Sequence, residues 1–223
     1  MQETIGLIGG TGDLGRALAV HLSKKYNLLL GSRSRDRAIE VVDSIRKEKE
    51  GRGHLRDNLS GVDNSDAVGL SDVAILTVPY ESALDTVKGL SSSFKQNQIL
   101  VSAAAAVCKT GNEFHADLGE SGSLSVTLKQ ILPPGVHMAT AFQTVPANIL
   151  YREKPILSDV LVAADSEECY QFVAKIVGSI EGLRPLFLGS LGLSGEIERL
   201  TALLLNLGIR NRLKSPTLKI NSF

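Results

Sequence analysis

Short apolar runs alternate along the chain with segments whose apolar residues recur at helical spacing, and this alternation limits the fold more than any other feature. Runs that are apolar at nearly every position suit the strands of a parallel sheet, because helices bury both faces of such a sheet. Five of these runs precede residue 103: Thr4–Ile8, Leu28–Leu30, Leu59–Val62, Val73–Val78 and Ile99–Ser102. We therefore predict an α/β fold of the Rossmann type, with a doubly wound and mostly parallel sheet.

The rest of the chain is expected to form a smaller, mainly helical part. Beyond a tetra-alanine loop, the sequence predicts a helix over Leu124–Ile131, strands over Val136–Phe142 and Ser158–Ala163, and helices over Glu167–Ile180 and Ser194–Arg212. We expect residues 1–150 to form a dinucleotide-binding domain and residues 151–223 a smaller region beside it. The last helix is strongly apolar, so we expect it to pack on the sheet domain or on a second copy in a homodimer.

Charge and composition exclude several classes of protein. The chain has 223 residues, with 24 Lys and Arg against 24 Asp and Glu, so its formal net charge is zero and neither a nucleic-acid nor a membrane partner is expected. The apolar runs are too short to span a membrane and the first residues show no basic leader, which favours a cytoplasmic protein. Cys108 and Cys169 are too few for a disulfide framework or a structural zinc site, and the four histidines show no metal-binding spacing.

A glycine-rich turn directly follows the first predicted strand and opens the first predicted helix. It matches the GxGxxG pattern over Gly10, Thr11, Gly12, Asp13, Leu14 and Gly15. Glycines at these places permit a tight turn, let the backbone approach a pyrophosphate, and allow the helix to pack closely on the strand. The unpaired N–H groups at the helix start then favour bound phosphate. The turn lacks the GK[ST] ending of a P-loop, and a glycine-rich turn without a ligand is the alternative.

The end of the second strand predicts which dinucleotide binds. A carboxylate there would accept hydrogen bonds from the ribose 2′-hydroxyl of NAD, but this chain has Gly31-Ser32-Arg33 and no acidic residue before Asp36. A guanidinium and a serine hydroxyl suit a 2′-phosphate instead, and Arg37 follows Arg33 by one helical turn. We therefore predict NADP(H) as the cofactor, the alternative being that these arginines only form a solvated basic face.

Two further segments follow strands and are expected to reach the same crevice. Val78 and Pro79 would form an apolar wall there, and Tyr80 would either stack near the nicotinamide or serve in ordinary packing. The second segment is Gln143–Ala147. Neither a Tyr-x-x-x-Lys pair nor a nucleophile elbow is present. Carbonyl reduction usually requires a general acid, so a site without one favours hydride transfer between two cofactors.

Taken together, these motifs resemble those of the deazaflavin-dependent NADP reductases, enzymes that pass a hydride between NADP and coenzyme F420. The resemblance covers nearly the whole chain and rests on Ile8–Gly15, Gly31–Arg33, Val73–Glu81, Thr144–Ala147, Glu181–Leu186, Glu198–Thr201 and Leu204–Asn206. It implies a Rossmann fold, NADP(H) and coenzyme F420 as small-molecule cofactors, and no catalytic side chain.

The resemblance also implies which residues bind each cofactor. Residues 11–14 would contact the pyrophosphate, and Ser32, Arg33 and Arg37 the 2′-phosphate. The nicotinamide contacts would come from Val78, Pro79, Tyr80, Ala105, Val107 and Ala147. The deazaflavin would lie against residues 103–107 and the segment from Gln143 to Pro146, completed by residues 151–223. This chain differs from the family pattern at Ala103 and Ala106, where prolines are usual, and at Gln143, where histidine is common.

Two other functions remain open from the residues alone. The first is an NADPH-dependent reductase of a small imine or keto acid, whose proton donor would come from a helix after the sheet. The helix over Ser194–Arg212 offers Glu196 and Glu198 but no lysine for that role. The second is a non-catalytic NADP(H)-sensing module whose last helix docks a partner.

Overall fold

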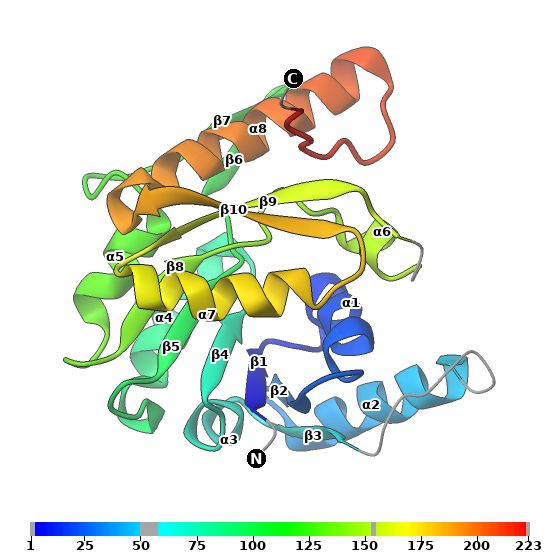
Figure 1. Cartoon of the computed structure of the whole chain (residues 1–223), viewed down its shortest axis with the longest axis vertical. Coiled ribbons are helices and arrows are strands. Elements are labelled where there is room, and N and C mark those ends of the chain that lie inside the picture. Colours follow the sequence, from blue (N-terminus) through cyan, green and yellow to red (C-terminus); the bar gives the residue numbers. More distant parts are fainter. Residues whose placement is uncertain (1–2, 50–57, 153–154, 222–223) are drawn as a thin grey trace.

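A single eight-stranded sheet with helices on both faces organises the chain (Figure 1). The computed structural model describes residues 3–49, 58–152 and 155–221. The strand order across the sheet is β3-β2-β1-β4-β5-β8-β9-β10. The order of the strands reverses between β1 and β4. The carboxyl ends of these two central strands therefore form a topological switch point. The predicted doubly wound, mostly parallel sheet is confirmed.

The first half of the chain builds five parallel strands and the helices between them. The elements are β1 (Thr4–Ile8), α1 (Asp13–Leu22), β2 (Asn27–Ser32), α2 (Arg35–Lys49), β3 (Leu59–Asp63), α3 (Asn64–Gly69), β4 (Val73–Leu76), α4 (Tyr80–Gly89), the short 3₁₀ helix η1 (Ser91–Ser93) and β5 (Ile99–Ser102). Parallel pairing places the carboxyl ends of β1, β2 and β4 at one edge of the sheet. The turns that follow these three strands therefore lie close together.

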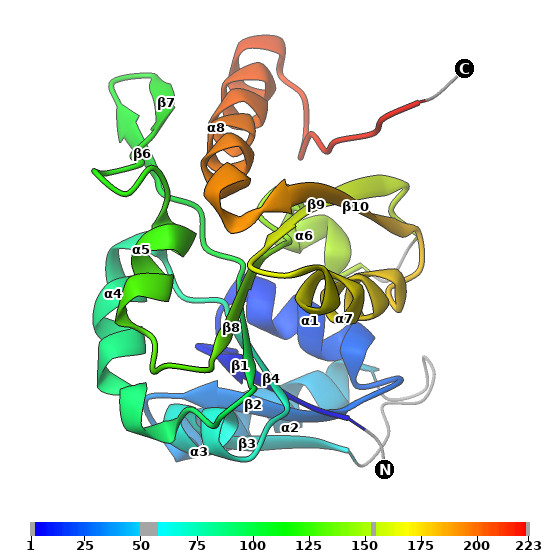
Figure 2. The same cartoon turned by 60° about the vertical axis from the view of Figure 1, so that its left-hand side comes forward.

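The second half adds three strands, a hairpin and the last helix. Its elements are β6 (Val107–Thr110), β7 (Glu113–Ala116), α5 (Leu124–Ile131), β8 (His137–Thr140), α6 (Ala147–Leu150), β9 (Ser158–Ala164), α7 (Glu167–Gly178), β10 (Leu183–Ser190), η2 (Leu191–Leu193) and α8 (Ser194–Asn211). Strand β8 is parallel to β5 but antiparallel to β9, and β9 is parallel to β10. The β6–β7 hairpin stands beside α8, outside the main sheet (Figure 2).

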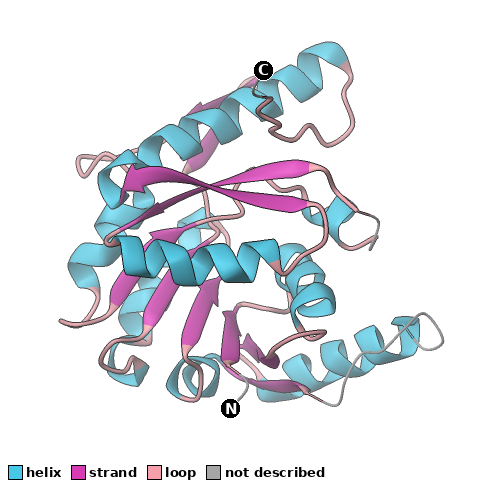
Figure 3. Cartoon of the chain, viewed as in Figure 1, coloured by secondary structure: helices cyan, strands magenta, loops and turns pink. Residues whose placement is uncertain are grey.

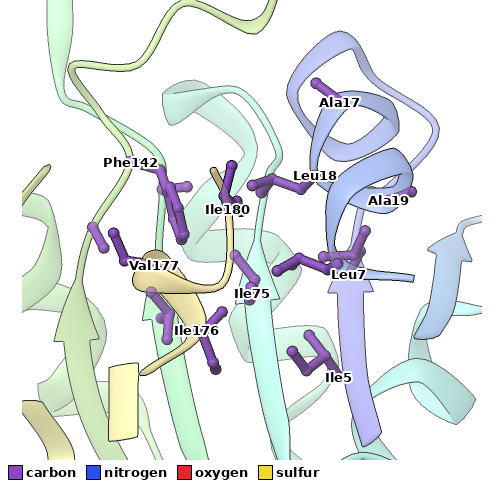
Figure 4. Close-up of a cluster of buried hydrophobic side chains, with 14 of the residues drawn as sticks. Ile5, Leu7, Ala17, Leu18, Ala19, Ile75, Phe142, Ile176, Val177 and Ile180 are labelled. Atoms are coloured by element: carbon purple, nitrogen blue, oxygen red, sulfur yellow. The ribbon is translucent and has the colours of Figure 1, made fainter. Parts of the chain in front are cut away.

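Side chains of alternate strand residues point to opposite faces of the sheet, and both faces are buried. On one face, Ile5 and Leu7 of β1 and Ile75 of β4 meet Leu18 of α1 and Ile176 of α7 (Figure 4). The intervening strand residues pack on the other face against α4 and α5: Ile8, Ala74, Leu76, Leu100 and Met138. This two-sided burial explains why the strands are apolar at consecutive positions. Figure 3 shows the resulting layers, with strands between two groups of helices.

The structure contains elements that the sequence did not predict, among them β10, α6 and the two strands of the β6–β7 hairpin. Strand β10 contains Pro185 and has an irregular register between Phe187 and Gly189, features that weaken a strand pattern but are tolerated at a sheet edge. Two expected strands also end early, because β4 stops at Leu76 and β8 spans only four residues. The other predicted elements agree to within a few residues at each end.

Candidate dinucleotide and acceptor sites

The turn between β1 and α1 requires glycines for two different reasons. A Cβ at Gly15 would lie 2.4 Å from the Cα of Gly10, so this glycine is required by the packing of the helix on the turn. A Cβ at Gly12 would meet nothing closer than the carbonyl oxygen of Gly9, at 3.6 Å. Gly12 therefore faces open space, and the protein's own packing does not require it. A ligand that approaches the backbone closely would require it.

Helix α1 begins at this turn without a side-chain cap. Gly12 is its N-cap residue, and no side-chain oxygen accepts from the first N–H groups of the helix. The turn itself is held by the Gly10 N–H, which donates to the Gly31 carbonyl at 2.8 Å, and by the Gly9 N–H, which donates to Oδ1 of Asn64 at 3.0 Å. An uncapped helix N-terminus offers donors and a partial positive charge to a phosphate group.

Three arginines follow β2, and two of them form ion pairs within the protein. Arg35 lies 3.6 Å from Asp66, and Arg37 lies 3.1 Å from Glu40. Arg33 is exposed and pairs with no carboxylate among the described residues. Its guanidinium is therefore the one of the three that the protein leaves available to an external anion.

A pocket of about 470 Å³ joins these features. Its lining residues come from the glycine turn, the ends of β2 and β4, and the starts of α2, α3 and α4: Gly9, Thr11, Gly12, Ser32, Arg33, Ser34, Arg37, Asn64, Thr77, Val78, Pro79, Ser82 and Thr86. The structure thus brings together Thr11, Gly12, Ser32, Arg33, Arg37, Val78 and Pro79 from the predicted site. The remaining predicted residues do not line it: Gly10, Asp13, Leu14, Gly15, Tyr80, Ala105, Val107, Gln143, Pro146 and Ala147.

Sequence reasoning missed five polar residues of this pocket: Ser34, Asn64, Thr77, Ser82 and Thr86. Two of them, Asn64 and Thr77, make hydrogen bonds to the end of β1 or to the turn after it. Asn64 begins α3 directly after β3, and its side-chain oxygen holds the glycine turn. Thr77 follows β4, and its hydroxyl donates to the carbonyl of Ile8 at 2.9 Å. The rule that ligands bind at the carboxyl ends of parallel strands would have pointed to both positions, because each residue comes directly after a strand.

Tyr80 does not line the 470 Å³ pocket, here called the dinucleotide pocket. Its hydroxyl donates to Oδ2 of Asp117 at 2.8 Å, and this hydrogen bond raises the pKa of Tyr80 to about 12. The Asp117 N–H in turn donates to the carbonyl of Ala106 at 2.7 Å. Tyr80 therefore connects α4 to the segments on either side of the β6–β7 hairpin, including the loop before Val107.

A second pocket, of about 350 Å³, lies between the segment after β8, helix α8 and the C-terminal residues. Most of its lining is apolar, with a few hydroxyl and amide groups: Gln143, Thr144, Val145, Pro146, Thr201, Leu204, Leu205, Gly208, Ile209, Leu213, Ser215 and Pro216. Apolar walls with a few fixed polar groups are typical of sites for small organic ligands. We call it the acceptor pocket.

Gln143 carries an unsatisfied polar atom at this pocket. Its Nε2 donates to the Ser102 carbonyl at 3.0 Å and to the hydroxyl of Thr140, while its Oε1 is buried without a hydrogen-bond partner in the described structure. The backbone of Phe142 just before it has φ of 76°, an uncommon conformation for a large side chain. A strained turn that presents an orphaned acceptor is typical of a ligand site, because an N–H group of a ligand would satisfy Oε1.

Neither candidate acid of α8 reaches a pocket. The side chain of Glu198 is fully buried, and its Oε1 accepts from the Leu124 N–H at 3.1 Å. Burial raises the pKa of Glu198 to about 7. Glu196 is exposed and forms an ion pair with Arg199. No carboxyl, imidazole or thiol group is found among the described residues that line either pocket.

The residues present fit the two cofactors that the sequence predicts. The open space at Gly12, the uncapped α1 and the unpaired Arg33 suit a dinucleotide with a 2′-phosphate. The apolar walls and the free Oε1 of Gln143 suit a flat ring that carries N–H groups. Across residues 3–49, 58–152 and 155–221, no cluster of His, Cys, Asp and Glu could hold a metal ion. Within the same ranges, no helix has the length and apolarity that crossing a membrane requires.

Comparison with known proteins identifies relatives along the full length of the chain. The family model described as "NADP oxidoreductase coenzyme F420-dependent" matches residues 4–106. An F420-dependent NADP reductase from Methanocaldococcus jannaschii is 31% identical over 98% of this chain and 98% of the relative. A protein of the same name from Methanothermobacter thermautotrophicus is 29% identical over 100% of this chain and 96% of the relative.

Solved structures show the same fold. A protein from Arthrobacter sp. FB24 superposes with a TM-score of 0.82 at 15% identity and covers 100% of both chains. A hypothetical protein from Sinorhizobium meliloti superposes with a TM-score of 0.70 at 26% identity, over 89% of this chain and 90% of its own. The full-length match to the Methanocaldococcus jannaschii enzyme and the family model agree, and the chain belongs to the family of coenzyme F420-dependent NADP oxidoreductases.

Proposed function

We propose that the protein transfers a hydride between NADP(H) and the deazaflavin coenzyme F420. The observation that carries this proposal is the full-length similarity to enzymes named F420-dependent NADP reductases. In the direction from NADPH, one hydride and one proton reduce the deazaflavin and NADP⁺ is left. Both rings carry this chemistry themselves, so the protein's part is to bind them, align them and exclude water.

On the NADP side, each group of the larger pocket has a distinct task. The N–H groups at the start of α1 would hold the pyrophosphate, with Gly12 leaving room for it. Arg33 and Ser32 would bind the 2′-phosphate, with Arg37 beside them. Val78 and Pro79 would form the apolar wall for the nicotinamide end. We also propose that the nicotinamide end is contacted by Tyr80, Ala105, Val107 and Ala147.

On the deazaflavin side, we place the ring in the acceptor pocket. The side chains of Val145, Pro146 and Leu204 would pack on its faces, and Oε1 of Gln143 would accept a hydrogen bond from a ring N–H. In this proposal residues 1–150 bind the dinucleotide, and residues 151–223 close the acceptor pocket through α8 and the C-terminal segment.

The described lining of the two pockets holds no carboxyl, imidazole or thiol group, and this favours the proposed function over carbonyl or imine reduction. A reductase of a keto acid or imine usually needs a general acid within hydrogen-bond distance of its substrate. Glu198, the best buried candidate, bonds to the start of α5 instead. Hydride transfer between two cofactors needs no such group from the protein.

A direct assay distinguishes the candidates. NADPH and oxidised F420 are mixed with the enzyme without oxygen, and the deazaflavin absorbance is followed. We expect rapid loss of that absorbance with NADPH and little with NADH, and no oxidation of NADPH by a panel of keto acids and imines. Oxidation of NADPH by a keto acid or imine, with F420 left unreduced, would overturn the proposal, and tight NADPH binding without any turnover would favour a sensing module.

We also propose that the protein is a homodimer that contacts its partner copy through α8. Leu203 and Leu207 lie one helical turn apart on this helix and are 53% and 42% exposed. Apolar side chains grouped on one helix face are typical of an interface. Light scattering at micromolar concentration should give the mass of two chains, and the mass of one chain would contradict the proposal.

A cytoplasmic location is proposed on the chemistry of the cysteines. Cys108 is exposed and Cys169 is buried, and both are free thiols. Unpaired thiols suit a reducing compartment. Burial raises the pKa of Cys169 to about 12, so that thiol stays protonated.

A further inference from the structure

The C-terminal residues 213–221, here called the tail, turn back from the end of α8 (Figure 1). Three of them form one side of the acceptor pocket. The N–H of Leu213 donates to the carbonyl of Gly208 at 2.9 Å, which closes the end of the helix. Leu213, Ser215 and Pro216 then line the pocket together with Gln143–Pro146 and α8. A wall of the pocket therefore consists of chain that lies outside every helix and strand.

Two groups of hydrogen bonds hold the tail in place. The side chains of Ser215 and Asn148 are joined at 3.0 and 3.1 Å, next to the pocket. Further along, the carbonyl of Leu218 accepts from the Asp159 N–H at 2.8 Å and from the Ser158 hydroxyl at 3.1 Å. The tail thus pairs with the start of β9, beyond the short stretch where β8 pairs with that strand.

Asp159 is the centre of the second group. Its side chain is 0% exposed, and its carboxylate accepts from Arg184 at 2.8 and 2.7 Å. The same carboxylate accepts from Nζ of Lys219 at 3.1 Å and from the Ile220 N–H at 2.5 Å. The hydrogen bonds from the Arg184 side chain are the largest of the effects that hold the pKa of Asp159 well below its usual range.

The tail supplies part of what keeps this charge buried. A carboxylate without water must be paired and hydrogen-bonded, since an uncompensated buried charge is strongly destabilising. Arg184 belongs to β10, whereas Lys219 and Ile220 belong to the tail. The Asp159 carboxylate accepts four hydrogen bonds, two from Arg184 and two from the tail. Undocking the tail would remove the last two and expose Asp159, so the buried carboxylate stabilises the docked position of the tail.

We propose that the tail is a positioned wall of the acceptor pocket, and that Asp159 acts through Lys219 and Ile220 to set the positions of Leu213, Ser215 and Pro216. Asp159 lines neither pocket, so it is a positioning residue. The identity of the ligand rests on the proposed function, but the docking of the tail does not. No tail residue lines the dinucleotide pocket, and NADP(H) binding should therefore be independent of it.

Two lysines of the tail provide a matched pair of variants. Lys219 bonds to Asp159, whereas Lys214 is exposed and forms no ion pair with the described residues. Lys219→Met and Lys214→Met each remove one positive charge from the tail, but only the first removes a donor from Asp159. Asp159→Asn removes the charge of the carboxylate itself and should have a larger effect than Lys219→Met. It is compared with the wild type once its folding has been confirmed.

Binding is measured separately for each cofactor, with F420 by its own fluorescence quenching and NADPH by calorimetry. We expect Lys219→Met to weaken F420 binding by about fivefold, with NADPH binding unchanged and Lys214→Met like the wild type. Hydrogen exchange of the ligand-free protein should show faster exchange of the tail amides, Ile220 first, in Lys219→Met only. The KM for F420 should rise more than kcat falls.

The outcomes separate the two proposals. Wild-type protein that binds NADPH but never F420 overturns the proposed function. Wild-type protein that binds F420, with a Lys219→Met variant whose tail exchanges faster yet binds F420 equally well, overturns the role of the tail alone. Equal weakening by both lysine variants would show a general effect of charge and would also overturn it.

Discussion

We propose that the choice of dinucleotide depends on Arg33. It stands at the end of β2, where a carboxylate would select NAD, and the structure leaves its guanidinium without an ion pair among the described residues. Its neighbours Arg35 and Arg37 are similar in sequence but are paired with Asp66 and Glu40. Position and pairing together, rather than the number of arginines, distinguish Arg33.

Replacement of Arg33 by alanine should therefore act on one cofactor only. We expect Arg33→Ala to weaken NADP(H) binding by about 1.5–3 kcal/mol, the usual value of a hydrogen bond to a charged group, and to leave NADH binding nearly unchanged. Calorimetric titration with both cofactors measures this. Arg35→Ala is the matched control, because Arg35 does not line the pocket. Equal losses for NADPH and NADH would show that Arg33 does not bind the 2′-phosphate.

Glu198 makes the stability of the protein depend on pH. Its pKa is raised by burial to about 7, above the ordinary 4.5 of a glutamate. The folded protein holds a proton that the unfolded chain releases, so this contribution to the free energy of unfolding is fully present below pH 4.5 and is lost as the pH rises through about 7. The full contribution of Glu198 to the free energy of unfolding is about 3 kcal/mol.

A glutamine at this position cannot ionise, so Glu198→Gln should lose that part of the pH dependence. Urea unfolding at about pH 5 and about pH 8 should show the wild type losing more stability than the variant over this interval. Glu196→Gln, on the exposed side of the same helix, should behave like the wild type. Parallel losses in wild type and Glu198→Gln would mean that Glu198 does not titrate in this range.

At the level of secondary-structure elements, the turn between β1 and α1 has one glycine that ligand binding requires, Gly12, and one that the fold requires, Gly15. Gly12→Ala places a methyl group no closer than 3.6 Å to other atoms and should leave the thermal stability nearly unchanged, while dinucleotide binding weakens by about tenfold or more. Gly15→Ala places it 2.4 Å from the backbone of Gly10 and should destabilise the fold by about 1–3 kcal/mol. Thermal unfolding and NADPH titration of both variants measure the contrast. A large loss of stability in Gly12→Ala would contradict it.

Elements with strong patterns were predicted well from the sequence, and elements without them were not. Strand β1, helix α5 and strand β5 have the predicted bounds, because their apolar residues are dense and turn residues flank them. The β6–β7 hairpin was missed, although Gly111-Asn112 between its strands is a two-residue hairpin signal. Its exposed strands lack an apolar face. Helix α8 holds the hairpin through Asn206, whose Oδ1 accepts from the Phe114 N–H and whose Nδ2 donates to the Phe114 carbonyl.

The site was predicted in part for the same reason. Residues at the carboxyl end of a strand or just beyond it, such as Ser32 and Val78, could be predicted from the rule that ligands bind at the carboxyl ends of parallel strands. The orientation of Tyr80 toward Asp117 could not be predicted, because their contact depends on how the hairpin packs. The wall formed by Leu213, Ser215 and Pro216 comes from the far end of the chain, and only the tertiary structure brings it to Gln143.

At the scale of the whole molecule, one continuous sheet supports both pockets. The dinucleotide pocket lies over the ends of β1, β2 and β4, and the acceptor pocket follows β8, which pairs with β5. The segment that carries Gln143 bonds to Ser102 at the end of β5, next to β4. A rigid sheet therefore fixes the spacing of the two sites, which is what alignment of two rings requires.

We propose that hydride passes directly from one bound ring to the other, without exchange of the transferred hydrogen with water. The most direct test uses two samples of NADPH, each deuterated at one of the two C4 positions of the nicotinamide, with F420 in ordinary water. We predict that one sample yields reduced F420 carrying the deuterium and that the other yields unlabelled product. Reduced F420 without deuterium from both samples, with the label found in water, would contradict direct transfer.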